Sequence, residues 1–210
     1  MFKQLARVIT GKVASAPVPG EQSPSYYDEL YAGSEEYLKP YWQSRYYFLW
    51  TVICDRLKNG GAQEVLEIGC GSGQFSELLH RENFATYVGM DISVEAIRQA
   101  KQKPLTPFRF EVADALVTDL LDEQSYDSVV CTEVLEHIEN DRELIQRIKP
   151  GTRCLCTVPN FPYVSHVRHF SSSEEVQARY QSWFADLKVW ELAGAHKEGT
   201  VYYLFDGIKT

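Results

Sequence analysis

Residues Val65–Gly73 have the sequence VLEIGCGSG, an apolar strand that runs directly into a glycine-rich turn. Glycine adopts positive φ without steric cost and lets the backbone approach a ligand closely. The following stretch, Gln74–Arg81, is expected to be a helix whose first N–H groups and positive dipole end would face an anionic group. This segment predicts a strand–turn–helix unit with a ligand at the turn. A plain tight turn between strand and helix is the alternative.

Strands and helices alternate through the rest of the chain. The expected strands are Glu64–Gly69, Thr86–Asp91, Phe108–Ala113, Asp127–Thr132, Thr152–Val158, Leu187–Leu192 and Val201–Phe205, with helices at Gln74–Arg81, Ser93–Lys101, Asp141–Ile148 and Ser173–Phe184. The connection between the last two strands is too short for a parallel crossover, so they should pair antiparallel. The sequence therefore predicts an α/β fold, a Rossmann-like doubly wound sheet of seven strands, mostly parallel, with one antiparallel strand near the edge.

Composition narrows the classes of protein. Of the 210 residues, 44% are hydrophobic and 24% are charged, as in an ordinary globular domain. The net charge of −8 disfavours a nucleic-acid partner, which usually requires a basic face. No apolar run is long enough for stable membrane insertion. The five cysteines are odd in number and form no CxxC pair, which indicates reduced thiols in a cytoplasmic protein.

Acidic residues follow three of the expected parallel strands. Asp91 lies about 20 residues beyond the glycines, where a carboxylate accepts hydrogen bonds from ribose hydroxyls. Asp114 follows the third strand and is placed to meet an adenine amino group, and Glu133 follows the fourth. Any one of them could be a solvated loop residue, but together with the glycine turn they predict a nucleoside cofactor. A dinucleotide dehydrogenase would more typically show GxGxxG and a second nucleotide-binding half, whereas this chain has GxGxG.

The stretch from Glu64 to Thr210 resembles the class I S-adenosylmethionine (SAM) dependent methyltransferases, and LEIGCGSG is close to their first motif. The resemblance implies SAM as the cofactor. It also implies a role for each matching residue: Gly69, Cys70, Gly71 and Gly73 around the methionine part, Glu67 supporting the turn, Asp91 on the ribose, Ile92 against the adenine, Asp114 and the backbone of Ala115 on the adenine edge, and Thr132 and Glu133 closing the methionine side.

The string Glu133–His137, EVLEH, places an imidazole and two carboxylates beside the expected methyl group. Methyl transfer requires alignment of the acceptor and, for a hydroxyl or ammonium, removal of a proton. His137 is the candidate general base, since its unperturbed pKa lies near neutrality. Glu136 is the candidate residue that orients it. The alternative is a capping or core histidine without a catalytic role.

The same ExxEH string resembles the metal-binding motif of small-RNA 2′-O-methyltransferases, which add a further histidine after the fifth strand. His166 and His169 lie in such a segment here, and two Glu with two His could hold a divalent cation. The typical continuation of that family is missing, and ExxEH also occurs in metal-independent enzymes such as the ubiquinone-type O-methyltransferases. We therefore predict that there is no metal site.

The segment containing His166 should line the acceptor side, where Arg168 would suit an anionic acceptor.

These observations lead to one hypothesis for function and two rivals. The leading hypothesis is methyl transfer from SAM to an oxygen or nitrogen of a small molecule. The rivals are an RNA 2′-O-methyltransferase with a Glu/His metal site, and a SAM-binding partner protein without catalysis. Residues 1–58 are expected to form an aromatic, helical N-terminal extension, broken at Gly33 and Pro40. It either acts as a lid, with Tyr26, Tyr27 or Tyr31 near the cofactor, or packs on the sheet. Residues 59–210 are expected to form the SAM-binding domain.

Overall fold

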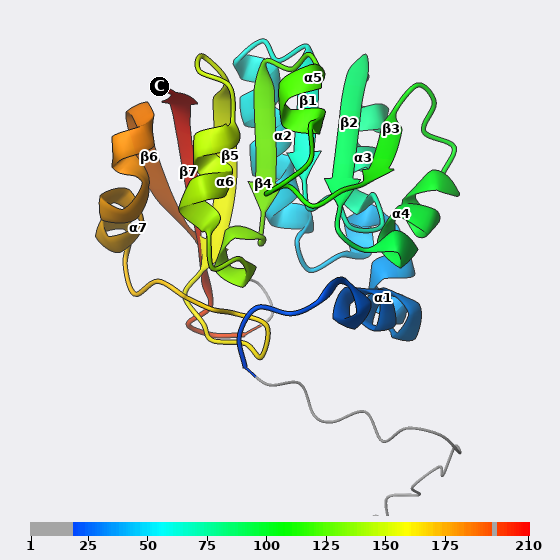
Figure 1. Cartoon of the computed structure of the whole chain (residues 1–210), viewed down its shortest axis with the longest axis horizontal. Helices are drawn as coiled ribbons and strands as arrows, with labels where there is room; N and C mark the ends of the chain where they lie inside the picture. The colour runs from blue at the N-terminus through cyan, green and yellow to red at the C-terminus, as the bar shows by residue number, and fades with distance from the viewer. Residues whose placement is uncertain (1–18, 195–196) are drawn as a thin grey trace, which may run out of the picture.

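The computed structural model describes residues 19–194 and 197–210. Seven strands form one sheet in the order β3-β2-β1-β4-β5-β7-β6 (Figure 1). Their bounds are β1 Glu64–Ile68, β2 Thr86–Asp91, β3 Arg109–Val112, β4 Ser128–Thr132, β5 Arg153–Pro159, β6 Phe184–Ala193 and β7 Val201–Lys209. Neighbouring strands among β1–β5 are parallel, and β7 is antiparallel to both β5 and β6. The predicted fold is confirmed, with β7 as the reversed strand.

Helices cover both faces of this sheet. One face carries α2 (Tyr47–Asn59), α3 (Gln74–Arg81) and α4 (Val94–Lys101), and the other carries α5 (Leu120–Glu123), α6 (Asp141–Arg147) and α7 (Ser173–Tyr180). Leu49 and Ile53 of α2 are fully buried with Leu155 of β5 in one apolar cluster. Leu144 and Ile145 of α6 are fully buried in the cluster on the opposite face. The two layers fix the carboxyl ends of the parallel strands at one edge of the molecule.

The end of α7 differs from the sequence prediction. A helix was expected over Ser173–Phe184, but α7 ends at Tyr180 and a short 3-10 helix, Gln181–Trp183, leads into β6 at Phe184. Phe184 is buried and its ring lies 6.0 Å from that of Phe205 on β7, so burial against the sheet ends the helix. A bulge between Ala185 and Lys188 follows, where Asp186 has a φ of 53°.

The N-terminal extension is broken where the sequence predicts. Helix α1 spans Pro24–Gly33, and Pro40 precedes a 3-10 helix at Tyr41–Gln43, after another at Glu35–Leu38. Helix α1 has no buried residue and lies beyond the carboxyl ends of the parallel strands (Figure 1). Helix α2 instead contributes to the core. The division at residue 58 stays a prediction, and residues 1–18 of the extension lie outside the described part of the chain.

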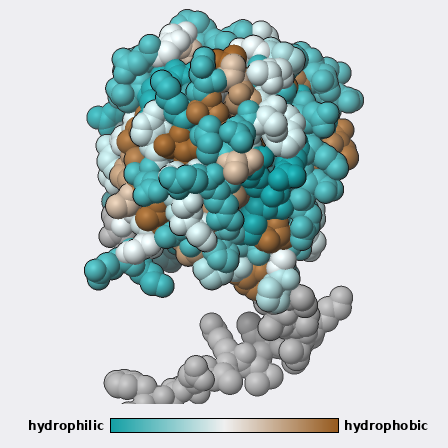
Figure 2. Space-filling view, turned by 90° about the vertical axis from the view of Figure 1, so that its left-hand side faces the viewer, coloured by the Kyte–Doolittle hydropathy of each residue, from teal (hydrophilic) through white to brown (hydrophobic). Residues whose placement is uncertain are grey.

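The surface and the cysteines complete the description. Figure 2 shows hydrophilic and hydrophobic residues mixed over the side formed by β6 and α7. Among the described helices, none has the length and apolar character needed to cross a membrane. All five cysteines are free and buried.

Candidate active site

The glycine-rich turn after β1 follows the path that its sequence predicts. Gly69 and Gly71 have φ values of +74° and +53°, a region that favours glycine. A Cβ on Gly69 would lie 2.2 Å from Cγ2 of Val134, and one on Gly71 would lie 2.8 Å from the hydroxyl of Tyr31. The turn therefore passes close to two other segments and has no room for a side chain at either position. Gly73 occupies the N-cap position of α3.

Asp91, at the end of β2, holds this turn in place. Its Oδ2 accepts a hydrogen bond from the backbone N–H of Gly71 (2.9 Å), and its Oδ1 accepts one from the N–H of Ser93 (2.9 Å). Burial raises the pKa of Asp91 to about 6, although both backbone N–H groups favour the charged form. The sequence predicted a ligand-binding role for Asp91 and missed this contact with the turn.

A cavity of about 300 Å³ opens at this edge of the sheet. Among the residues predicted to bind the cofactor, all except Gly73 line it: Glu67, Gly69, Cys70, Gly71, Asp91, Ile92, Asp114, Ala115, Thr132 and Glu133. The sequence therefore identified most of one wall. Their individual roles with SAM remain predictions.

Two buried carboxyl groups in this wall have strongly shifted pKa values. The hydroxyl of Tyr87 donates a hydrogen bond to Oε2 of Glu67, and burial raises the pKa of Glu67 to about 8. Burial likewise raises the pKa of Glu133 to about 8, and Oγ1 of Thr157 lies 3.0 Å from its Oε1. Glu133 also has a φ of 56°, which turns the chain sharply after β4. Both groups are thus mostly uncharged at neutral pH.

The other wall comes largely from the N-terminal extension, where the sequence placed Tyr26, Tyr27 or Tyr31 near the cofactor but assigned no other residue. Tyr27, Leu30 and Tyr31 of α1 line the cavity, as do Tyr37, Arg45, Tyr46 and, from β7, Tyr202. Helix α1 is attached by polar contacts: Oδ1 of Asp28 accepts hydrogen bonds from the hydroxyl of Ser93 (2.7 Å) and the N–H of Glu95 (3.0 Å). Whether α1 moves as a lid stays a prediction, but it does cover the cavity.

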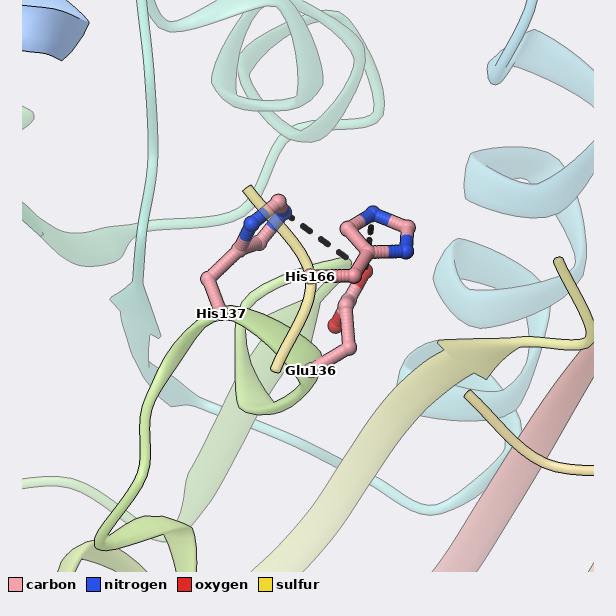
Figure 3. Close-up of side chains that lie close together, drawn as sticks. All are labelled: Glu136, His137 and His166. Atoms are coloured by element: carbon pink, nitrogen blue, oxygen red, sulfur yellow. Dashed lines mark ion pairs between the residues drawn. The ribbon is translucent and has the colours of Figure 1, made fainter. Parts of the chain in front are cut away.

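Glu136, His137 and His166 converge on the same cavity. Figure 3 shows their side chains pointing toward one another. Nε2 of His137 lies 3.7 Å from Oε1 of Glu136, and Nε2 of His166 lies 4.0 Å from it. The backbone carbonyl of Glu136 accepts a hydrogen bond from the N–H of Val167 (2.8 Å), which holds the segment of His166 against Glu136.

The two imidazoles have the same hydrogen-bonding arrangement. Nδ1 of His137 lies 2.9 Å from the carbonyl of Ser165, and Nδ1 of His166 lies 3.0 Å from the carbonyl of Phe161. A carbonyl only accepts, so each Nδ1 carries the proton and each Nε2 keeps a lone pair. Burial lowers the pKa of His137 to about 4 and also lowers that of His166. Burial raises the pKa of Glu136 well above its usual range.

Two sequence interpretations of the segment after β5 need correction or refinement. Arg168, expected to suit an anionic acceptor, does not line the cavity. Its guanidinium donates to the backbone carbonyls of Leu135, Ile138 and Glu139, so it supports the loop after β4. His169 is exposed, and within the described residues the group with metal-ligand spacing contains His166 but neither His169 nor Glu133. Sequence spacing alone does not separate His166 from His169.

Known proteins resemble this chain in sequence and in fold. A family model described as a methyltransferase domain matches residues 35–204. The ubiquinone biosynthesis O-methyltransferase of Salmonella typhimurium is 33% identical over 103 residues, which cover 45% of this chain and 42% of that protein. The match thus spans less than half of that relative's length.

Solved structures extend the similarity in fold. The magnesium protoporphyrin IX methyltransferase of Synechocystis PCC 6803, solved with bound S-adenosylhomocysteine (SAH), has a TM-score of 0.60 at 18% identity, covering 77% of this chain and 82% of that one. The cyclase SpnF has a TM-score of 0.67 at 15% identity, covering 92% of this chain and 99% of that one. At such identities the likeness shows the fold alone, because one fold serves several chemistries.

Proposed function

Since this chain belongs to the methyltransferase domain family, we propose that it transfers a methyl group from SAM to an oxygen or nitrogen of a small molecule. The family is that of the class I SAM-dependent methyltransferases, and its cofactor is SAM. The observation that supports catalysis most directly is the neutral imidazole of His137, with Nε2 free to accept a proton, in the cavity beside the glycine turn. A protein that only binds SAM has no need of such a base.

The residues of the cavity fit SAM. Bound SAM supplies a methyl group attached to a positively charged sulfur, together with a ribose, an adenine and a charged amino acid part. Gly69 and Gly71 line the cavity with backbone at positive φ, and Asp91 offers carboxylate oxygens at the ribose position that the resemblance implies. Arg45 is the only Lys or Arg among the described residues that line the cavity. We therefore assign Arg45 to the carboxylate of the methionine part.

His137 would remove the proton of the acceptor. Its Nδ1–H donates to the carbonyl of Ser165, which leaves the lone pair on Nε2, 3.7 Å from Oε1 of Glu136. Because burial lowers the pKa of His137 to about 4, the ring is unprotonated at neutral pH. Such a weak base accepts the proton as the new bond to the methyl group forms and not before.

The pH dependence follows from this assignment. A base is active only when it has lost its proton, and the lowered pKa means that His137 loses it near pH 4. We expect the titration of His137 to make kcat rise with pH through about 4 and to add no rise near neutrality, whereas an unperturbed histidine would give a rise near pH 6.5. Steady-state rates from pH 3.5 to 8, with enzyme integrity checked by circular dichroism at each pH, measure this. A rising limb near neutrality that is present in the wild type and absent from the residual activity of His137→Ala would contradict the assigned environment of His137.

The second candidate function is RNA 2′-O-methylation with a metal ion. The convergence of Glu136, His137 and His166 favours it, because carboxylate and imidazole groups are common metal ligands. In addition, the Nδ1–H group of each histidine donates to a backbone carbonyl, as in many metal sites. However, ligands about 2.1 Å from one ion lie roughly 3.0–3.4 Å apart, and the observed spacings of 3.7 and 4.0 Å are wider. The net charge of −8 also disfavours RNA. We propose a metal-free site and a small acceptor.

One experiment separates these functions. Purified protein is analysed for Mg, Mn, Co and Zn, and SAH formation is then measured with pooled metabolites and with short RNA, each with and without EDTA. We expect less than about 0.1 metal ion per chain, turnover with the metabolite pool, and no effect of EDTA. A stoichiometric metal and turnover of RNA that EDTA abolishes would establish the rival function. SAM binding without turnover of either substrate would favour the non-catalytic partner protein.

A cytoplasmic location also stays a proposal. It is supported by the five free cysteines, all of which are buried, since such thiols are typical of a reducing compartment.

A further inference from the structure

Glu136, His137 and His166 bring several hydrogen-bond acceptors together, and the two carboxyl oxygens of Glu136 are buried without a donor in the described part of the chain. Glu136 is 0% exposed, and neither of its carboxyl oxygens has a hydrogen-bond partner among the described residues. Both imidazoles direct Nε2, and therefore a lone pair, toward Glu136. Buried polar groups without partners are costly and are normally satisfied by a ligand or by water. The three side chains line the cavity, so whatever enters there can supply the missing hydrogen bonds.

The charge state of this set favours a neutral ligand. The pKa of His137, lowered to about 4 by burial, leaves its ring uncharged at neutral pH, and burial raises the pKa of Glu136, which favours its protonated form. An ammonium group only donates hydrogen bonds and therefore cannot accept one from the O–H of a protonated Glu136. A hydroxyl group donates to an imidazole and can also accept from a protonated carboxyl. Hydroxyl groups therefore match both the uncharged imidazole of His137 and a protonated carboxyl of Glu136.

The spacing of the set suits two hydroxyl groups and not one. Nε2 of His137 and Oε1 of Glu136 are 3.7 Å apart, and Nε2 of His166 lies on the other side of that oxygen at 4.0 Å. Hydroxyl oxygens on neighbouring carbon atoms are about 3 Å apart, and each hydrogen bond spans about 2.8 Å. One hydroxyl can thus bond to His137 while its neighbour bonds to Glu136 and His166.

Aromatic rings surround the same point. The ring of Tyr27 lies 6.1 Å from that of His137, and the rings of Tyr163 and Phe161 lie 5.6 and 5.7 Å from that of His166. All three line the cavity. Such walls bury the apolar faces of a ring-shaped molecule.

We propose that the acceptor is a ring with two adjacent hydroxyl groups, of which one is methylated at His137 while the other is held by Glu136 and His166. This inference rests on the proposed methyl transfer and selects oxygen as the methylated atom. The proton of the first hydroxyl passes to Nε2 of His137 as its oxygen forms a bond to the methyl carbon. The carbon–sulfur bond breaks, and its electron pair stays on the sulfur of SAH. Glu136 and His166 position the ring by binding the second hydroxyl.

Two pairs of small molecules test the second hydroxyl. Catechol and phenol differ by one hydroxyl on an aromatic ring, and cis-cyclohexane-1,2-diol and cyclohexanol differ in the same way on a saturated ring. Binding of each is measured by calorimetry to the wild-type protein saturated with SAH, in EDTA. We expect the diol to bind about 10- to 100-fold more tightly than the mono-alcohol in at least one pair, because the latter leaves buried acceptors unsatisfied. The pair that shows the preference identifies an aromatic or a saturated ring.

Variants connect the preference to the named residues. Glu136→Gln and His166→Phe should reduce the preference for the diol to less than about 3-fold. Glu143→Gln, the same change at an exposed carboxylate on α6, should leave it intact. Equal binding within both pairs in the wild-type protein, or an undiminished preference in both variants, would overturn the proposal.

Product analysis with SAM separates this inference from the proposed function. A diol preference without transfer to any small molecule contradicts the proposed function and leaves the binding site standing. Transfer to mono-alcohols or amines at rates equal to those for diols supports the function and overturns the inference.

Discussion

Replacement of His137 by alanine is expected to lower kcat by about 10²–10⁴-fold while leaving the affinity for SAM nearly unchanged. Two imidazoles line the described cavity, those of His137 and His166. In each, Nδ1–H donates to a backbone carbonyl and Nε2 keeps a lone pair that can accept a proton. Single-turnover rates with a known acceptor measure the chemical step, and calorimetry with SAH measures cofactor binding. Loss of the base should therefore separate the two quantities.

A structural role for His137 would give a different pattern. Removal of a packing side chain lowers the melting temperature and has little specific effect on rate. Glu136→Gln tests the pair further, because it keeps the size of the side chain and should share part of the loss if Glu136 positions the acceptor. A stable His137→Ala variant that binds SAM and turns over at the wild-type rate would remove His137 from the mechanism, and acceptor alignment alone would have to explain catalysis.

Asp91→Ala is expected to weaken SAM binding by about 10- to 100-fold, which corresponds to roughly 1.5–3 kcal/mol for hydrogen bonds to a charged group. Two effects combine in this variant: the ribose loses its carboxylate partner, and the turn loses the bond from the N–H of Gly71 to Oδ2. Calorimetry with SAH and with adenosine measures the loss, which should be similar for both ligands. Unchanged binding would show that Asp91 has no ribose role.

Arg45→Met provides the matched control for Asp91. Arg45 lines the cavity through a segment remote from the glycine turn in sequence, and we assign it to the carboxylate of the methionine part. This variant should weaken binding of SAH but leave adenosine binding unchanged, because adenosine lacks the amino acid part. The contrast between the two ligands then distinguishes loss of a specific contact from general damage to the cavity.

The sequence predicted the sheet and one wall of the cavity because both depend on local patterns. Strand periodicity, the glycines at Gly69 and Gly71 and the acid that ends β2 are all encoded within short segments, and the parallel topology brings their ends together. The cap of α4 is equally local: the hydroxyl of Ser93 accepts a hydrogen bond from the N–H of Ala96.

Apart from the tyrosines of α1, the opposite wall could not be predicted because it depends on long-range contacts. Arg45 and Tyr46 precede the sheet in the chain, and Tyr202 follows most of it, yet all three line the same cavity. Their segments carry no motif that indicates a ligand. The choice of His166 over His169 is set by the irregular loop after β5, which has no periodicity from which to derive side-chain direction.

The attachment of α1 has a consequence for the rates of cofactor exchange. Because no residue of this helix belongs to either apolar core, it can separate from the sheet without opening them. Its contacts through Asp28 are hydrogen bonds that water can replace. Local opening of this kind costs far less free energy than global unfolding. The residence time of SAH should therefore be governed by the strength of a few replaceable polar bonds, so that product escape can limit turnover even when methyl transfer itself is fast.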